Sequence, residues 1–282
     1  MTGTLHTVGG RSVLRFERRL AHPREKVWRA LTEPAELAHW FPATMETELR
    51  VGAPIRFEDR NQPGEPLTGE ITELDPPRLF AYTWSDSELR WELRPDGDGC
   101  VLMFTHTFDD RPAAASYATG WDGCLDVLDT SLAGRPPSDP TAHYAERHEA
   151  YVDAFDLLEG HVDETPDGWR VRFERQFPHP IDAVWSTLTS GDEPVVGEPP
   201  PVGFTNGYAS ATTVTATERP TTLEYATDAG QVAWQLTSGP GGARVKLTHT
   251  MPRDAADHTT TALAAWHTHL ELLGRRLSGE DV

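Results

Sequence analysis

Cysteine is scarce in this sequence of 282 residues: only Cys100 and Cys124 are present, and their spacing fits no metal-binding motif. Both stand among apolar residues, which predicts two buried free thiols. The sequence has no run of about 18 apolar residues, the length that a membrane-spanning helix needs. Its N-terminal segment shows neither the basic stretch nor the apolar stretch of a signal peptide. We therefore expect a cytoplasmic protein without a membrane span.

Positive charge is also in short supply. The chain has 25 lysines and arginines against 44 aspartates and glutamates, which gives a formal net charge of −19. Because phosphate backbones are bound by dense basic surfaces, this acidic balance argues against nucleic acid as a partner. It indicates little else about function, since high solubility explains it equally well.

Motifs of catalysis and cofactor binding are missing as well. The sequence contains no GxSxG, no phosphate-binding loop, no GxGxxG, no HExxH and no paired CxxC. His267 and His269 are two positions apart on a predicted helix, about 200° around its axis, so they cannot share a metal ion. We expect no cofactor and no metal.

What the sequence does contain is an internal repeat. Leu14–Thr32 and Val171–Thr189 are identical at 10 of 19 positions, with an offset of 171 − 14 = 157 residues. Further matches follow in the same order: the segments of Trp91 and Trp234, Phe104–Thr107 and Leu247–Thr250, and the segments of Trp121 and Trp266. Similar segments in the same order with consistent spacing indicate a duplicated domain.

The two copies are unequal. We expect a complete domain at residues 1–160, with a connecting helix at its end, and a shorter, degenerate domain at 161–282. The first copy alone has a segment like Pro34–Pro42, which predicts a short second helix at Ala35–Trp40. Its place in the second copy is taken by a proline-rich stretch that no helix can occupy.

The connection between the copies has its own pattern. Apolar residues at helical spacing from Tyr144 to Leu158 predict a connecting helix with one apolar face. After it we expect a short linker at Glu164–Gly168.

The repeat also shows which face of each predicted strand is buried. An inward position stays apolar in both copies, whereas an outward position varies among polar residues. This comparison predicts three inward rows: Leu102, Phe104 and His106; Leu89, Trp91 and Leu93; and Phe80, Tyr82 and Trp84. Apolar residues three and four positions apart predict a long helix at the end of each copy. The predicted fold class is therefore α+β, with a curved antiparallel sheet wrapped around a long C-terminal helix in each copy.

These segments together resemble the helix-grip superfamily. In the first copy they read AHPREKVWRALTEPAELAHWFP, RVGAPIRFE, LTGEITELDPPRLFAYTW, VLMFTHTF and GWDGCLDVL. The likeness is to the branch related to the C-terminal domain of activators of the Hsp90 ATPase, with START-like (SRPBCC) and polyketide-cyclase relatives. It covers residues 11–132 and, less completely, 170–277. The resemblance implies a cavity between sheet and helix that commonly holds a small apolar or amphipathic molecule.

Inward and apolar residues of the first copy are the candidate ligand contacts. They are Trp40, Phe41, Met45, Tyr82, Trp84, Trp91, Phe104, His106, Trp121 and Cys124. A pocket and a plain core have the same composition, so Trp91 and Trp121 fit either a pocket wall or the core. Trp40, Phe41 and Met45 have no counterpart in the second copy. We expect them to gate the pocket of the first domain, although a satellite of the core is the alternative.

His106 is the main polar candidate. An inward histidine at a strand end is able to orient a ligand carbonyl or to act as an acid or base. Its repetition as His249, in a copy with a degraded entrance, favours a structural hydrogen bond instead.

Two inward arginines, Arg18 and Arg175, lie at equivalent strand ends. For each we expect a salt bridge to a neighbouring carboxylate, with Glu73 and Glu218 as candidates, in preference to a role as ligand anchor. Asp122 on the long helix is expected to point to solvent or to the pocket mouth.

Three classes of function remain open. The first is non-catalytic binding of a small hydrophobic or amphipathic molecule by the first domain, with a mainly structural second domain. The second is a polyketide-cyclase-like or hydrolase-like enzyme that uses the same cavity, against which the scarcity of acid and base groups weighs. The third is an interaction protein with an unspecified partner, as the likeness to Hsp90 activators suggests. Fold alone does not decide among them.

Overall fold

The computed structural model describes residues 3–60, 64–136, 139–228, 230–239 and 241–280 of the chain. The chain divides into two compact units, residues 1–147 and 148–282, and the division falls inside helix α4 (Tyr144–Ala154). The helix predicted between the copies is thus present. The domain boundary predicted between residues 160 and 161 stays a prediction.

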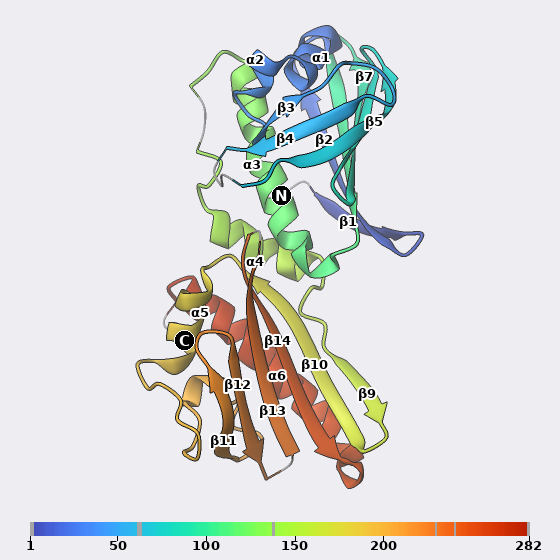
Figure 1. Ribbon diagram of the computed structural model, residues 1–282. Coiled ribbons are helices and arrows are strands. Elements are labelled where there is room, and N and C mark those ends of the chain that lie inside the picture. Colours follow the sequence, from blue (N-terminus) through green and yellow to red (C-terminus); the bar gives the residue numbers. More distant parts are fainter. Residues whose placement is uncertain (1–2, 61–63, 137–138, 229, 240, 281–282) are drawn as a thin grey trace. The chain divides into compact units, whose positions relative to one another are not determined.

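The first unit is an eight-stranded antiparallel sheet with a long C-terminal helix (Figure 1). Its elements are β1 (Thr4–Val8), β2 (Arg11–Leu20), α1 (Arg24–Thr32), α2 (Pro34–Leu37), β3 (Ala43–Glu46), β4 (Pro54–Asp59), β5 (Leu67–Asp75), β6 (Leu79–Trp84), β7 (Ser87–Asp96), β8 (Gly99–Phe108), a 3-10 turn at Arg111–Ala113 and α3 (Ala114–Leu132). The strand order is β1-β2-β8-β7-β6-β5-β4-β3.

The second unit repeats this plan with six strands in the order β11-β12-β13-β14-β10-β9. After α4 come β9 (His161–Thr165), β10 (Gly168–Phe177), α5 (Ile181–Thr189), the 3-10 helix η2 (Val202–Phe204), β11 (Ala211–Glu218), β12 (Thr222–Thr227), β13 (Gly230–Gly239), β14 (Gly242–Pro252), the 3-10 helix η3 (Arg253–His258) and α6 (Thr259–Leu277). Each unit is therefore a helix-grip domain of the α+β class, as the sequence predicts.

Two local predictions were wrong. Glu164–Gly168 is no linker, because Thr165 pairs with Gly168 across a tight turn that joins β9 to β10. The short helix α2 ends at Leu37 and does not reach Trp40. Beyond it the Trp40 side chain turns inward, and its Nε1 donates a hydrogen bond to the Ala30 carbonyl at 2.9 Å.

The inward rows of the first sheet are confirmed. Residues at every second position of β7 and β8 are buried, and Trp91 on β7 lies directly opposite both Phe80 on β6 and Phe104 on β8. This register stacks aromatic side chains across three neighbouring strands on the face that α3 covers.

An inward arginine marks the sheet of each unit, largely buried in the first and fully buried in the second, but its partner was predicted wrongly. Arg18 donates to Asp122 on α3 at 2.5 Å, and the Asp122 side chain is only 5% exposed. Glu73, the expected partner, instead pairs with Arg90 on the outer face. Asp122 thus neutralises a buried cation and does not face solvent.

Arg175, the equivalent residue of the second unit, pairs with Glu149 from α4. Its guanidinium also donates to the Leu270 carbonyl at 2.6 Å. Gly274 on α6 leaves room for this pair, since an added Cβ would lie 2.5 Å from Arg175 Nη2. The position of Asp122 is taken in the second unit by the exposed His267, so the neutralising carboxylate has to come from another helix.

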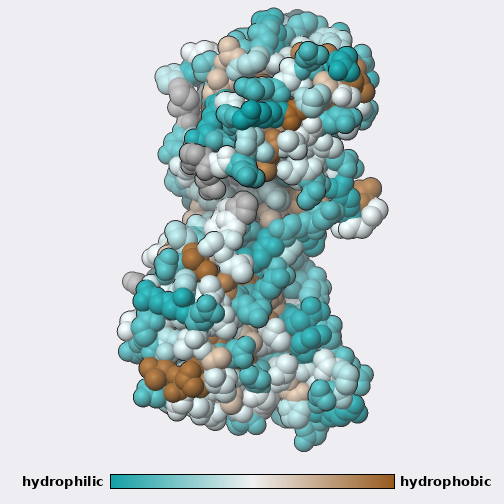
Figure 2. Space-filling model, in the orientation of Figure 1, coloured by the Kyte–Doolittle hydropathy of each residue, from teal (hydrophilic) through white to brown (hydrophobic). Residues whose placement is uncertain are grey.

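The surface in Figure 2 is mainly hydrophilic on the face shown, with apolar groups in small separate patches. In the described part of the chain, helices are too short or too polar to cross a membrane.

Replacing Asp122 by Asn keeps the shape of the side chain and removes the charge beside Arg18. We expect the free energy of unfolding of the first unit to fall by about 2–3 kcal/mol, because a largely buried guanidinium loses its nearest counter-charge. Urea denaturation of the full chain, followed by hydrogen exchange of peptides from β2 and α3, measures this loss.

Asp126→Asn is the matched control, because Asp126 lies 3.8 Å from Arg18 with a side chain that is 45% exposed. We expect this variant to lose less than about 1 kcal/mol. Equal losses in the two variants would contradict the assignment of Asp122 as the essential partner.

Candidate functional site

Eight aromatic side chains of the first unit gather between its sheet and α3. This aromatic cluster consists of Trp40, Phe41, Phe57, Tyr82, Trp84, Trp91, Phe104 and Trp121. Strands β4, β6, β7 and β8 supply five of them at alternating positions, and α3 supplies Trp121 from its buried face. The last two, Trp40 and Phe41, come from the irregular residues between α2 and β3.

The rings of the aromatic cluster contact one another. Trp91 stacks on Phe104 with ring centroids 3.9 Å apart, and Trp121 meets Phe104 edge-on at 4.6 Å. Trp40 packs edge-on against Trp91 at 5.5 Å. The residues expected from the sequence to line a cavity are thus brought together, but as neighbours in direct contact.

Trp84 lies at the partly exposed edge of the cluster. Its ring is held between two phenylalanines, with Phe57 stacked at 4.7 Å and Phe41 at 5.4 Å. The indole Nε1 is buried and has no hydrogen-bond partner among the described residues. Such an N–H group has lost its hydrogen bonds to water and has gained no hydrogen bond to the protein in return.

His106 has a structural partner. Its Nδ1 accepts a hydrogen bond from Trp121 Nε1 at 3.1 Å, and in the second unit His249 Nδ1 accepts from Trp266 Nε1 at 3.2 Å. Burial, together with the positive charge of Arg11, lowers the pKa of His106 to about 3. The ring is therefore neutral near pH 7, and the recurrence of the contact in both units favours the structural interpretation over acid or base catalysis.

Met45 and Cys124, the remaining candidate ligand contacts, have different neighbours. Met45 on β3 is buried and pairs across the strands with Phe57, so it lies beside the cluster. The Cys124 thiol interacts electrostatically with the Tyr144 hydroxyl. Burial raises the pKa of Cys124, which keeps the thiol protonated.

In the second unit the equivalent space holds Phe204, which sequence reasoning missed, together with the ring of His269, whose centroid lies 5.7 Å from Trp234 and 5.5 Å from Trp266. Phe204 on η2 is fully buried and packs edge-on against Trp234 at 5.5 Å, the same distance at which Trp40 meets Trp91. The sequence signal was weak, a single aromatic residue after the proline-rich stretch. Phe204 has no counterpart of Phe41 beside it.

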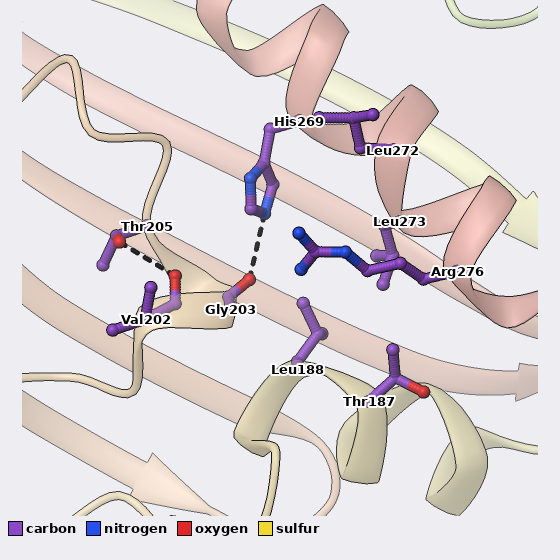
Figure 3. A pocket seen from close by; sticks show the side chains of 9 residues that line it. All are labelled: Thr187, Leu188, Val202, Gly203, Thr205, His269, Leu272, Leu273 and Arg276. Atoms are coloured by element: carbon purple, nitrogen blue, oxygen red, sulfur yellow. Dashed lines mark hydrogen bonds between the residues drawn. The ribbon is translucent and has the colours of Figure 1, made fainter. Parts of the chain in front are cut away.

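A small cavity of about 100 Å³ lies next to this residue, between α5, η2 and α6. Figure 3 shows His269 and Arg276 reaching from α6 toward the backbone of Gly203. His269 Nε2 donates to the Gly203 carbonyl at 3.0 Å, and burial lowers the pKa of His269 to about 4. The cavity has room for a few water molecules, which is too little for an organic ligand of ordinary size.

A larger groove of about 530 Å³ in the first unit is lined by apolar residues together with several charged ones, among them Arg19, Asp126 and Arg147. Its carboxylates are already engaged: Asp126 contacts Arg147 at 3.2 Å, and Asp129 contacts Arg135, which lies outside the groove lining, at 2.9 Å. This groove offers little to an apolar ligand, so the aromatic cluster remains the candidate site.

The lowered pKa of His106 makes the first unit sensitive to acid. Below pH 6.5 the unfolded chain binds a proton at this residue, whereas the folded chain binds it only near pH 3. Stability is therefore full above pH 6.5 and falls as the pH drops toward 3. We expect this residue to lower the free energy of unfolding by about 2 kcal/mol between pH 6.5 and pH 4.5.

Urea denaturation of the first unit at these two pH values tests the effect in the wild type and in His106→Asn, whose amide oxygen is able to accept from Trp121. The variant should lose this part of the pH dependence. His143→Asn is the control, because His143 is largely exposed. An unchanged slope in His106→Asn would refute the assignment.

Comparison with known proteins shows a family to which the first unit is similar. Residues 21–133 match the family described as "Activator of Hsp90 ATPase homolog 1-like protein". A search of the curated proteins found no significant match. Similar solved structures include CalU16 from Micromonospora echinospora, with 25% identity and a TM-score of 0.45 over 54% of this chain and 95% of that chain.

Two further solved structures illustrate the range of similarity. A conserved protein of unknown function from Enterococcus faecalis has 19% identity and a TM-score of 0.45, covering 54% of this chain and 91% of its own. The Aha1 dimer from Colwellia psychrerythraea has 19% identity and a TM-score of 0.38, covering 43% of this chain and 95% of that chain. The family match thus lies within the first unit, whose residues 21–133 are similar to the activator of Hsp90 ATPase homologue 1-like family, and both units have the helix-grip fold.

Proposed function

We propose that the first unit binds one small, largely apolar molecule at its aromatic cluster, and that Phe41 with Trp40 forms a gate over the site. The observation that carries the proposal is the buried N–H of Trp84, which lacks a hydrogen-bond partner among the described residues. Such a group costs about 1–3 kcal/mol. A bound molecule that presents an acceptor at this edge relieves the cost.

The chemistry of the cluster supports an apolar guest. Aromatic side chains provide large apolar faces at low cost in conformational entropy, and ligand sites are lined mainly by such residues with a few polar groups. Because the rings contact one another, the guest has to displace one of them. Phe41 is the candidate, since its ring stands on the irregular segment before β3 and contacts Trp84 and Trp121 only at 5.4 and 6.0 Å.

The second unit supports the proposal by contrast, and we assign it a mainly structural role. Phe204 occupies its interior and is tied to the sheet, because Tyr225 and Trp234 both donate hydrogen bonds to its carbonyl at 2.7 and 3.1 Å. Because its carbonyl is bound in this way, Phe204 resists displacement. In the described residues no hydrogen bond to the carbonyl of Phe41 is recorded.

Binding is favoured over catalysis by the titratable groups of the cluster. His106 is neutral and its Nδ1 is occupied by Trp121. Burial raises the pKa of Tyr82 far above neutrality, so this phenol keeps its proton. A general acid or base requires a pKa near the working pH, and neither group has one.

The family description also names activation of a chaperone ATPase. For this chain that alternative depends on the name of the family, whereas the binding proposal depends on Trp84 and on the gate. We therefore develop the binding proposal.

The test uses a fluorescent ketone, 6-propionyl-2-(dimethylamino)naphthalene, titrated into the full chain with tryptophan quenching as the readout. We expect one binding site per chain. Phe41→Leu should bind the ketone about threefold more tightly, because displacing a smaller gate costs fewer aromatic contacts.

Phe204→Leu is the matched control, since it makes the same change at the residue that fills the second unit. Its affinity for the ketone should equal that of the wild type. The proposal fails if the wild type does not bind the ketone, or if Phe204→Leu alters the affinity as much as Phe41→Leu does.

A further inference from the structure

One pair of hydrogen-bond donors is used differently in the two units. Tyr82 and Trp91 of the first unit correspond to Tyr225 and Trp234 of the second. The strand register establishes this equivalence: Phe80 lies opposite Trp91, Leu223 lies opposite Trp234, and in each case the tyrosine follows two positions later on the same strand.

In the second unit both donors are satisfied by a single acceptor. The Tyr225 hydroxyl and Trp234 Nε1 converge on the backbone carbonyl of Phe204. Gly203 makes this position reachable, because an added Cβ would lie 2.3 Å from the Leu188 carbonyl oxygen. The neighbouring carbonyl of Gly203 is held from the other side by His269 (Figure 3). The chain itself thus places a phenyl ring and a carbonyl group between the sheet and the long helix of this unit.

The first unit supplies the ring without the carbonyl. Trp40 takes the place of the Phe204 ring, but its indole is bound to the Ala30 carbonyl. Among the described residues, Trp91 Nε1 donates to the Tyr82 oxygen at 3.3 Å, a long hydrogen bond. The Tyr82 oxygen is the acceptor of this hydrogen bond, and its own hydroxyl hydrogen has no acceptor recorded in the described part of the chain. Tyr82 is only 2% exposed, so solvent does not replace the missing acceptor.

From this difference we infer that the molecule bound by the first unit carries a carbonyl group, whose oxygen accepts hydrogen bonds from Tyr82 and Trp91 as the Phe204 carbonyl does from Tyr225 and Trp234. The inference rests on the proposed function and names the chemical class of its ligand: an uncharged aromatic or alicyclic ketone, ester or amide. The second unit in effect contains a built-in copy of that ligand.

Other acceptors fit the donor pair less well. A carbonyl oxygen has two lone pairs and no proton, so it accepts from both donors and leaves nothing unpaired. A hydroxyl group would bring a proton that itself needs an acceptor among aromatic rings. A carboxylate would bury a charge beside groups that offer no cation, at a high desolvation cost.

A pair of probes of similar size tests the inference. One is the ketone used above; the other is 6-propyl-2-(dimethylamino)naphthalene, in which a methylene group replaces the carbonyl. We expect the full chain to bind the ketone about tenfold more tightly than the propyl compound, because the Tyr82 hydroxyl goes unpaired beside the methylene and Trp91 keeps only its long hydrogen bond to Tyr82.

Tyr82→Phe should reduce this preference to about threefold or less, since one donor is lost. Tyr225→Phe is the matched control in the second unit. It should leave the preference unchanged while lowering the stability of the second unit, because the Phe204 carbonyl loses a donor.

Infrared spectroscopy of the ketone labelled with ¹³C at the carbonyl provides a readout that does not require a variant to fold. Two hydrogen bonds should shift the carbonyl stretch of the bound ketone to lower frequency than in an aprotic solvent. In Tyr82→Phe the shift should be smaller.

The outcomes separate the two proposals. If neither probe binds, the proposed function fails and the inference fails with it. If both probes bind with equal affinity, or if the carbonyl stretch is that of an aprotic solvent, the binding function stands and the carbonyl inference is overturned. Equal weakening of both probes by Tyr82→Phe would also overturn it, because the tyrosine would then act only in packing.

Discussion

The contact between one tryptophan of the sheet and one of the long helix organises both units. Trp91 meets Trp121, and Trp234 meets Trp266, with ring centroids 5.8 Å apart and an angle of 78° between the planes in each case. The helix indole of each pair then donates to a histidine on the strand beside it. Large rings with a hydrogen-bonded edge permit few alternative arrangements. This contact therefore sets the separation between helix and sheet, and the other side chains have to fit the space that remains.

That remaining space is filled in two ways. The first unit fills it with rings from several elements, and Phe41 and Trp40 stand on a segment that follows a helix of four residues. The second unit fills it with Phe204 on a shorter segment, whose two successive carbonyls are bound by the sheet and by α6. In the first unit the Trp84 N–H and the Tyr82 hydroxyl lack an acceptor among the described residues, whereas in the second unit Tyr225 and Trp234 are both paired with the Phe204 carbonyl. The proposed division into a binding unit and a structural unit follows from this contrast.

The inward arginines of the two units also meet one physical requirement in two different ways. A guanidinium at the end of β2 or β10 cannot stay buried without a counter-charge. Asp122 provides it from the long helix in the first unit, and Glu149 provides it from α4 in the second. Where the helix position changed from aspartate to histidine, a carboxylate from another element and the small residue Gly274 took over. The physical requirement persisted while the residues that meet it changed.

The inward rows and the long helices could be predicted because they depend on local periodicity in the sequence. The duplication was visible as well, and it allowed each periodic pattern to be checked in a second copy. Most residues of the candidate site were found in the same way: alternation along β6, β7 and β8 places Tyr82, Trp91 and Phe104 on one face. The partner of Arg18, the filling of the second unit by Phe204 and the direct contact among the rings were decided by the tertiary structure. These features depend on contacts between side chains from segments far apart in the sequence. The residue spacing within one segment does not determine which side chains of another segment it will contact.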